Sequence, residues 1–166
     1  DSIYIEAPNG RQMVIDGGPS GSISKAIKSE IPEGDTSIDV LVLTHPDADH
    51  YAGFVEFLKT YSVGTVIESG KNSNAKTYQQ FESLITEKNI PKVIARKGTK
   101  VTLDDVNNVT YTVLFPDRDV SGLPTNDASI VGRLVYKDVS VMLTGDAPIA
   151  TEKFIIGSTD PEDIKS

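Results

Sequence analysis

The feature that most constrains the fold of this chain is a change of pattern near Lys92. Before that residue, strand signals alternate with helical stripes, and after it short strand signals follow one another. Many strands mixed with helices in this way predict a layered α/β fold in which two sheets pack face to face and helices lie outside. With 166 residues, the chain is long enough for a compact domain with a core of its own. We therefore expect a single α/β domain over residues 1–166.

The individual elements follow from apolar periodicity and turn signals. Two alternating segments on either side of Pro8-Asn9-Gly10 predict a hairpin, and residues 39–43 form a short apolar run that is typical of a strand buried on both faces. The elements expected in the first half are strands at 2–7 and 12–16, a helix with Ile23, Ala26, Ile27 and Ile31 on one face, the strand at 39–43, a helix with Phe54, Phe57, Leu58 and Tyr61, a strand at 63–67, and a helix with Tyr78, Phe81, Leu84 and Ile85. The second half predicts strands at 93–95, 100–103, 109–115, 129–136 and 139–143, the last two paired across Lys137-Asp138.

Composition limits the class of protein and the kind of site. No apolar run approaches the roughly 18 residues that a membrane-spanning helix needs, so the chain as given is expected to be soluble. The chain has no cysteine, so a metal site would have to use oxygen and imidazole ligands. A net charge of −8 argues against a protein that holds nucleic acid by a broad basic surface. Any contact with nucleic acid is therefore expected to be local.

One loop concentrates the residue types that bind metals. The stretch T-H-P-D-A-D-H contains both histidines of the chain and two aspartates, and it directly follows the strand at 39–43, at the end where open α/β sheets gather ligands. In an extended segment alternate residues share a side, so His45, Asp47 and Asp49 are expected to point one way. His50 then follows at the start of the next helix. The cluster predicts a metal site, although each residue alone could be a helix cap or an ordinary hydrogen-bonding histidine.

This loop, preceded by I-D-V-L-V-L, resembles the signature of the metallo-β-lactamase superfamily, with Asp47 at the position of the second histidine. Asp16-Gly17-Gly18 resembles the aspartate–glycine turn of that family, and Leu143-Thr144-Gly145-Asp146 resembles its later strand ending in an aspartate. Asn126-Asp127-Ala128-Ser129 resembles the variant found in the competence protein ComEC and its relatives, which also have the aspartate substitution. The resemblance implies an αββα sandwich of four layers.

The resemblance also implies a role for each matching residue. The implied ligands are His45 and Asp47 for a first metal ion, Asp49 and His50 for a second, and Asp146 as a bridge between them. Of these, Asp49 and Asp146 are the implied catalytic residues. Asp16, Asn126 and Ser129 are expected to lie around the ligands without binding metal, and Asn126, which stands where the family has a third histidine, is a poor ligand. Asp146 has an alternative role, because it precedes an apolar helical stretch that it could cap.

The ligand set bears on the identity of the metal. With Asp47 and Asn126 in place of histidines, the ligands are harder and more anionic, which favours Mn²⁺ or Mg²⁺ over Zn²⁺. Two divalent ions roughly 3.5–4 Å apart activate water and polarise a phosphoryl or carbonyl oxygen. The expected cofactors are therefore two divalent ions, and hard ions suit phosphodiesters better than β-lactams.

Both ends of the chain suggest a piece of a longer protein. Asp1 opens directly into a strand-like pattern, and the last histidine of ComEC relatives, in a H-H-G-S element, has no counterpart before Ser166. We expect the αββα domain to be truncated at both ends and incomplete at its C-terminus, with weak activity or none. The alternative is a degenerate relative that has lost part of the site. The resemblance implies a parent protein with a membrane-embedded channel and this domain on the extracytoplasmic face of the cell membrane. The sequence does not predict an oligomeric state.

Three functions remain open from the sequence. The first is a metal-dependent phosphodiesterase acting on DNA, because ComEC-like domains are thought to degrade the strand that is not imported. The second is a small-molecule hydrolase on the same fold, which the acidic composition favours. The third is a binding module, favoured by the missing third and last histidines. The basic residues Lys92, Arg96, Lys97 and Lys100 could follow a phosphate backbone or belong to an ordinary solvated strand pair, and no substrate-binding residue is assigned.

Overall fold

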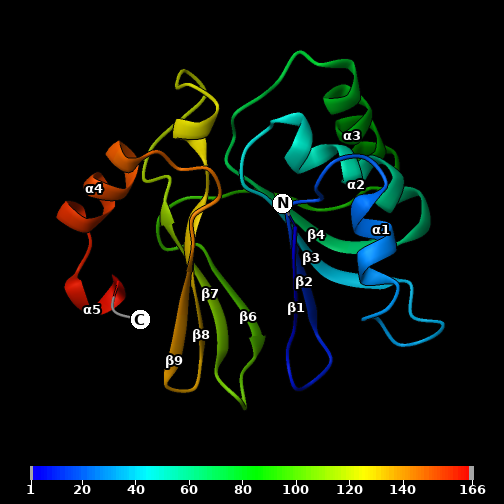
Figure 1. The fold of residues 1–166 in the computed structure, drawn as a ribbon, viewed down its shortest axis with the longest axis horizontal. Coiled ribbons are helices and arrows are strands. Elements are labelled where there is room, and N and C mark those ends of the chain that lie inside the picture. Colours follow the sequence, from blue (N-terminus) through cyan, green and yellow to red (C-terminus); the bar gives the residue numbers. More distant parts are fainter. Residues whose placement is uncertain (1, 165–166) are drawn as a thin grey trace.

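The computed structural model describes residues 2–164 and contains two β-sheets packed face to face (Figure 1). The first sheet consists, in spatial order, of β1 (Ile3–Glu6), β2 (Gln12–Ile15), β3 (Ser37–Leu43), β4 (Ser62–Glu68) and β5 (Lys92–Ile94). The second consists of β6 (Lys100–Asp104), β7 (Val109–Phe115), β8 (Val131–Tyr136) and β9 (Val139–Leu143). The helices are α1 (Ser22–Ile27), α2 (Ala48–Thr60), α3 (Lys76–Glu87), α4 (Ile149–Ser158) and α5 (Pro161–Ile164), with a short 3₁₀ helix η1 (Asn126–Ala128) before β8.

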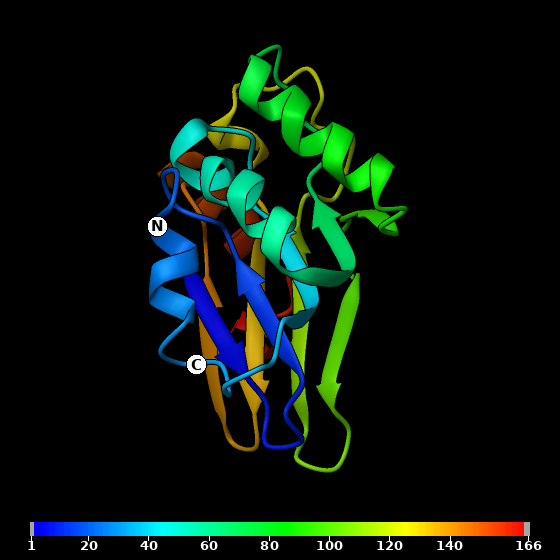
Figure 2. The ribbon, with the colours of Figure 1, turned by 90° about the vertical axis from the view of Figure 1, so that its right-hand side faces the viewer.

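The helices form the two outer layers of the sandwich. The first three, α1 to α3, cover the outer face of the first sheet and lie in front of it in Figure 2, whereas α4 and α5 lie on the outer side of the second sheet (Figure 1). The resulting order of helix, sheet, sheet and helix confirms the αββα fold class expected from the sequence. No helix within residues 2–164 is long and apolar enough to cross a membrane.

Within residues 2–164, three apolar clusters hold these layers together. The cluster between the first sheet and its helices includes Phe54 and Phe81, whose stacked rings have centroids 5.9 Å apart. The cluster between the two sheets includes Met13 and Tyr111, both fully buried. A smaller cluster joins the second sheet to α4 through Ile155. Because burying one large apolar side chain contributes about 1.5–3 kcal/mol, the two larger clusters dominate the stability of the sandwich.

The first sheet brings the carboxyl ends of its central strands to one edge. Strands β2, β3 and β4 run parallel, with Val14 beside Leu41 and Leu41 beside Val66, while β1 is antiparallel to β2. Helices α1, α2 and α3 each connect one parallel strand to the next. The segments that follow β2 and β3 therefore lie side by side, which is the place where such sheets form binding sites.

Most of the expected elements are present, and a few differ at their ends. The helix expected to extend through Ile31 stops at Ile27, and a turn carries Ile31 into the core. The strand expected from Ser129 begins at Val131, because Ser129 closes the η1 turn. Strand β5 begins and ends one residue earlier than expected. Apolar periodicity reports burial, and both Ile31 and Ser129 are buried outside regular structure.

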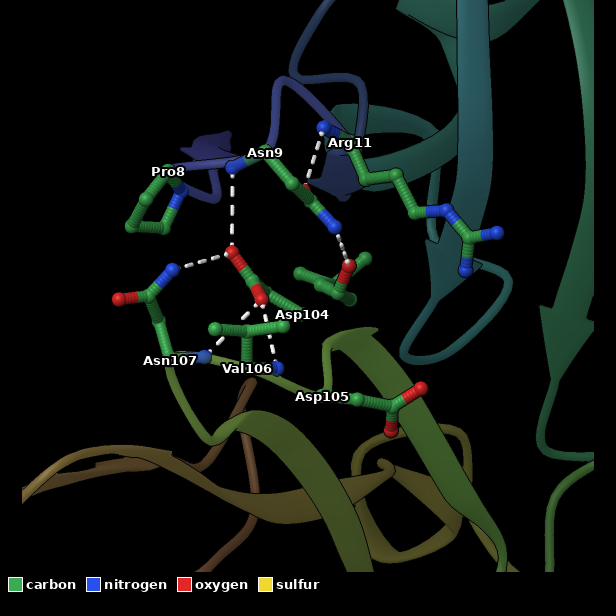
Figure 3. Close-up of a pocket in the computed structure, with 8 residues that line it drawn as sticks. Pro8, Asn9, Arg11, Asp104, Asp105, Val106 and Asn107 are labelled. Atoms are coloured by element: carbon green, nitrogen blue, oxygen red, sulfur yellow. Dashed lines mark hydrogen bonds between the residues drawn. The ribbon is translucent and has the colours of Figure 1, made fainter.

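A polar contact joins the two sheets at the end of the sandwich that carries the hairpin turns. The buried Asp104 carboxylate accepts a hydrogen bond from the backbone N–H of Asn9, at 3.1 Å (Figure 3). It also accepts bonds from Val106 and Asn107 in its own turn, at 2.9–3.0 Å. The Asn9 side chain donates to the Leu103 carbonyl at 2.8 Å. These bonds fasten the β1–β2 turn to the β6–β7 turn, around a hollow of about 410 Å³.

An ion cluster around the buried carboxylate of Glu68 lies where β4, β5 and α3 meet. Glu68, at the end of β4, is 3 % exposed, and the Lys92 ammonium lies 3.1 Å from it and 2.7 Å from Glu82 of α3. One oxygen of each carboxylate is buried without a hydrogen-bond partner among the described residues. Burial and the charge of Glu82 raise the pKa of Glu68 to about 7, although Lys92 opposes the shift. Glu68 therefore holds a proton up to nearly neutral pH.

This cluster should make the protein less stable as the pH rises through neutrality. The folded-state pKa of Glu68, about 7, lies above its ordinary value of 4.5, so its contribution to stability is complete below pH 4.5 and is lost as the pH rises through about 7. Glu68→Gln keeps the shape of the neutral acid and cannot ionise. We expect its melting temperature to change less than that of the wild type between about pH 5 and about pH 8, and to be the higher of the two at the upper value. Thermal melts followed by circular dichroism test this, and an equal pH dependence of the two proteins would contradict it.

Candidate metal centre

The T-H-P-D-A-D-H loop lies at the carboxyl ends of β2 and β3. His45 follows β3, and Asp47 directly precedes α2. The sequence predicts an extended segment through Asp49, but α2 begins at Ala48, so Asp49 and His50 both lie in its first turn. Asp146 comes from the turn after β9, in the other sheet. The candidate site is therefore assembled from both sheets.

His45, His50 and Asp146 form a compact group of ligand atoms. One ligand atom of each residue lies within 4.8 Å of the others, and the two imidazole rings have centroids 4.1 Å apart with an angle of 51° between their planes. His50 Nε2 lies 3.5 Å from Asp146 Oδ1. Both imidazoles are buried, whereas the Asp146 side chain is exposed to solvent. Two imidazoles and a carboxylate are ligands that divalent transition metals accept.

Asp47 and Asp49 border this group on the solvent side. Asp47 Oδ2 lies 3.7 Å from His45 Nε2, and Asp49 Oδ2 lies 3.8 Å from His50 Nε2. Both separations are longer than a hydrogen bond, so the carboxylates face the imidazole nitrogens without bonding to them. The structure thus brings all five residues that the sequence analysis treats as ligands into one region.

The alternative role of these aspartates as helix caps does not account for the arrangement. Asp47 occupies the N-cap position of α2, but its side chain makes no capping hydrogen bond. The N-cap position of α4 is occupied by Pro148, so Asp146 does not cap that helix. Both carboxylates therefore remain available to a cation.

Asp16 lies beneath the loop and contacts it through both carboxylate oxygens. The buried side chain accepts hydrogen bonds from the Thr44 N–H at 2.8 Å, from the Thr44 hydroxyl at 2.7 Å and from His50 Nδ1 at 2.8 Å. The φ angle of Asp16 is 58°, in the left-handed region that aspartate tolerates better than most residues. The contact with His50 turns Nε2 of that ring toward Asp146, as an orienting role for Asp16 requires.

The pKa values of the two imidazoles are shifted in opposite directions. Burial lowers the pKa of His45, and the neighbouring His50 lowers it further. Burial also acts to lower the pKa of His50, but the hydrogen bond and charge of Asp16, together with the charge of Asp146, outweigh it and raise that pKa. His45 is therefore the ring that stays neutral to lower pH, and the neutral ring is the form that binds metal ions.

Two buried polar atoms in this region have no hydrogen-bond partner within residues 2–164. They are Nε2 of His45 and Oγ of Ser129. A buried polar atom left without a partner costs about 1–3 kcal/mol. A divalent ion bound at Nε2 of His45 would satisfy the orphaned nitrogen. The residues present therefore fit a metal ion.

Ser129 and Asn126, the two remaining residues predicted to surround the ligands, differ in burial. Ser129 is buried next to the loop, since the N–H of the following residue, Ile130, donates to the Thr44 carbonyl at 3.0 Å. Asn126 lies on η1 and is exposed. In the described part of the chain, no hydrogen bond joins the Asn126 side chain to a proposed ligand. Ser129 therefore lies against the site, and Asn126 does not take the place of a ligand.

Two glycines let α2 approach the turn after β2. The Gly17 N–H donates to the His50 carbonyl at 2.6 Å, and the Gly53 N–H donates to the Gly18 carbonyl at 2.9 Å. A Cβ on Gly53 would overlap the Gly17 carbonyl oxygen, and one on Gly17 would lie 2.7 Å from the Phe54 nitrogen. The position of His50 depends on this close approach. The helical stripe in the sequence carries no signal for Gly53, because only the packed structure shows what it touches.

The basic residues near β5 make internal contacts. Lys92 pairs with Glu68 and Glu82, Arg96 donates to a carbonyl after β4 at 3.0 Å, and Lys97 donates to a carbonyl at the end of α4 at 2.8 Å. Lys100 is exposed at the start of β6. Three of the four cations therefore make contacts within the fold, which argues against a free basic strip that follows a phosphate backbone.

Comparison with known proteins identifies the family. The sequence model of the metallo-beta-lactamase superfamily matches residues 1–163, so this chain belongs to that superfamily. A search of curated proteins finds no significant match. The resemblance drawn from the loop and the two aspartate turns is thereby confirmed at the level of the superfamily.

Solved structures share the fold at low sequence identity. A metallo-beta-lactamase of Cronobacter sakazakii with a HARLDQ motif is 18 % identical with a TM-score of 0.55, over 86 % of this chain and 54 % of that one. The metallo-beta-lactamase fold protein YhfI from Bacillus subtilis is 17 % identical with a TM-score of 0.54, over 85 % and 52 %. Rubredoxin oxygen:oxidoreductase from Desulfovibrio gigas is 18 % identical with a TM-score of 0.53, over 80 % and 30 %. These likenesses show the fold alone, and this chain spans about half the length of the first two proteins.

Gly53→Ala should displace α2 and with it His50. The added methyl group overlaps the Gly17 carbonyl, and we expect the forced shift to lower the free energy of unfolding by about 1–3 kcal/mol. Gly157→Ala is the matched control, because Gly157 also lies in a helix and a Cβ there meets no atom within 4 Å. Its free energy of unfolding should be unchanged or higher, since alanine favours helix. Urea unfolding measures both values, and equal stability of the two variants would count against the close contact.

Proposed function

We propose that this domain is a metal-dependent hydrolase of phosphodiesters. The observation that carries the proposal is the convergence of two buried imidazoles with three carboxylates at the carboxyl ends of β2 and β3. The superfamily to which the chain belongs consists generally of metal-dependent hydrolases. A ligand set with more carboxylates than imidazoles suits hard ions such as Mn²⁺ and Mg²⁺, which bind phosphate oxygens well.

Each side chain has a separate role in this proposal. His45 and His50 would hold two ions through Nε2, with Asp47 and Asp49 beside them and Asp146 between them. Bound divalent ions would supply an activated water and polarise the phosphoryl oxygen. Asp49 and Asp146 lie 3.8 and 3.5 Å from His50 Nε2 and are open to solvent, so they place proton acceptors where water can reach the site. They are the proposed catalytic carboxylates.

For the substrate we propose DNA, with a ComEC-like DNA-uptake protein as the parent. The support is the sequence pattern, in which Asp47 replaces the second histidine and Asn126-Asp127-Ala128-Ser129 precedes β8. On this proposal the domain acts outside the cell membrane, beside a membrane-embedded channel. Because Lys92, Arg96 and Lys97 make internal contacts, DNA would be held mainly through the metal ions.

A small-molecule hydrolase is the second candidate, and the pocket beside the site favours it. This pocket has a volume of about 230 Å³, adjoins His50 and Asp146, and has apolar walls at Ile3, Met142 and Leu143. No lysine or arginine lines it among the described residues. A small pocket without a cation fits a compact substrate better than a strand of DNA.

Mn²⁺ should raise the melting temperature of the wild-type protein. A ligand that binds only the folded state stabilises it by mass action, by about 2.7 kcal/mol at a hundred times Kd. His45→Ala and Asp49→Ala should lose most of this shift. Asp105→Ala removes an exposed carboxylate from the β6–β7 turn and should keep it. Thermal melts with Mn²⁺ and Zn²⁺ test the site, and we expect the larger shift with Mn²⁺. If neither ion shifts the melting temperature, the metal site is wrong.

Turnover assays separate the three functions. With Mn²⁺ present, we expect slow hydrolysis of bis(p-nitrophenyl) phosphate and of labelled single-stranded or double-stranded DNA. Asp146→Ala should lower each rate by about 100-fold or more, as removal of a group that stabilises the transition state commonly does, and Asp105→Ala should not. Cleavage of the small ester without cleavage of DNA would favour the small-molecule hydrolase. Metal binding without any hydrolysis would leave the binding module.

A further inference from the structure

Thr44 lies within a chain of hydrogen bonds that ends at both imidazoles. Its Oγ1 is 2.7 Å from Asp16 Oδ2 and 3.0 Å from His45 Nδ1. The same Asp16 oxygen is 2.8 Å from His50 Nδ1. One carboxylate oxygen therefore reaches His50 directly and reaches His45 through the Thr44 hydroxyl.

The chemistry of these groups sets the direction of each bond. A carboxylate only accepts, so the Thr44 hydroxyl and His50 Nδ1 both donate to Asp16. A hydroxyl has a single proton, so Thr44, having donated it to Asp16, can only accept from His45 Nδ1. In their neutral forms both rings therefore carry their proton on Nδ1. The Nε2 lone pair of each ring is left facing the carboxylates of the candidate site.

The surrounding chain holds Thr44 in one orientation. Its N–H donates to Asp16 Oδ1 at 2.8 Å, and its carbonyl accepts from the Ile130 N–H at 3.0 Å. Gly145, beside the proposed bridging aspartate, packs against the side chain, since a Cβ there would lie 3.0 Å from Thr44 Cβ and 3.1 Å from Oγ1. Thr44 is 2 % exposed, so its hydroxyl cannot turn to bulk water. The residue is fixed by both sheets.

We propose that Thr44 is a positioning residue of the metal site. Its hydroxyl donates to the Asp16 carboxylate and accepts from His45 Nδ1, and so holds His45 in the tautomer in which Nε2 can bind metal. The proposal rests on the proposed metal site and adds that the Asp16 carboxylate orients both imidazoles, His50 directly and His45 through Thr44. The competing role is packing alone, in which the Thr44 methyl group fills the space beside Gly145. Groups that orient metal ligands are typically worth about 10–100-fold in metal affinity.

Thr44→Val and Thr44→Ser separate these two roles. Valine keeps the branched shape without the hydroxyl, and serine keeps the hydroxyl without the methyl group. The first measurement is the His45 tautomer in the metal-free protein, from the ¹⁵N chemical shifts of the ring nitrogens at a pH where the rings are neutral. The second is Mn²⁺ affinity by calorimetry. Thr44→Ser should keep the Nδ1–H form and bind Mn²⁺ as the wild type does, whereas Thr44→Val should populate the Nε2–H form and bind about 10–100-fold more weakly.

Two results would overturn the proposal. One is a wild-type tautomer and affinity in Thr44→Val, and the other is an equal loss in Thr44→Ser, which would assign the effect to the methyl group. If Thr44→Val does not fold, Thr44→Ala compared with Thr44→Ser isolates the hydroxyl in the same way. The tautomer is read without metal, so it decides the role of Thr44 independently of Mn²⁺ binding. Failure of the wild type to bind Mn²⁺ would overturn the proposed function instead.

Discussion

The buried carboxylate of Asp16 is the interaction on which the candidate site depends. The residue is 4 % exposed, and its oxygens accept three hydrogen bonds from Thr44 and His50. A buried charge is costly unless its oxygens are paired, so neither the loop nor the first turn of α2 can move without leaving Asp16 unsatisfied. The imidazoles are held in place by this electrostatic requirement, and the exposed aspartates are arranged around rings that are already fixed.

The fold supplies what Asp16 needs. Parallel pairing of β2 and β3 brings Asp16 beside Thr44, and the contact between Gly17 and Gly53 lets α2 approach closely enough for His50 to reach the same carboxylate. The second sheet adds Asp146 from the end of β9. Apolar packing between the sheets, together with the hydrogen bonds of Asp104 at the turns, holds the second sheet, and with it Asp146, in place against the first sheet.

Much of this arrangement could be predicted from the sequence, and the exceptions have physical causes. The loop residues are close in the chain, so their clustering was visible, but the start of α2 at Ala48 places Asp49 on a helix and not on an extended segment. The basic residues Arg96 and Lys97 looked available in the sequence, yet both donate to backbone carbonyls. A side chain's partner depends on which strand or helix packs against it, and composition does not report this.

By itself, the sequence predicted the layers and most of the candidate ligands, because both are recorded in local patterns: apolar periodicity along each segment, and four candidate metal ligands within six residues of the chain. Only the tertiary structure decided that a single oxygen of Asp16 serves both imidazoles, through Thr44 on one side and directly on the other. Asp16 and His50 are 34 residues apart in the chain. Their contact exists because two parallel strands and a glycine-lined helix meet at one edge, and the packing of such elements is a property of the whole fold.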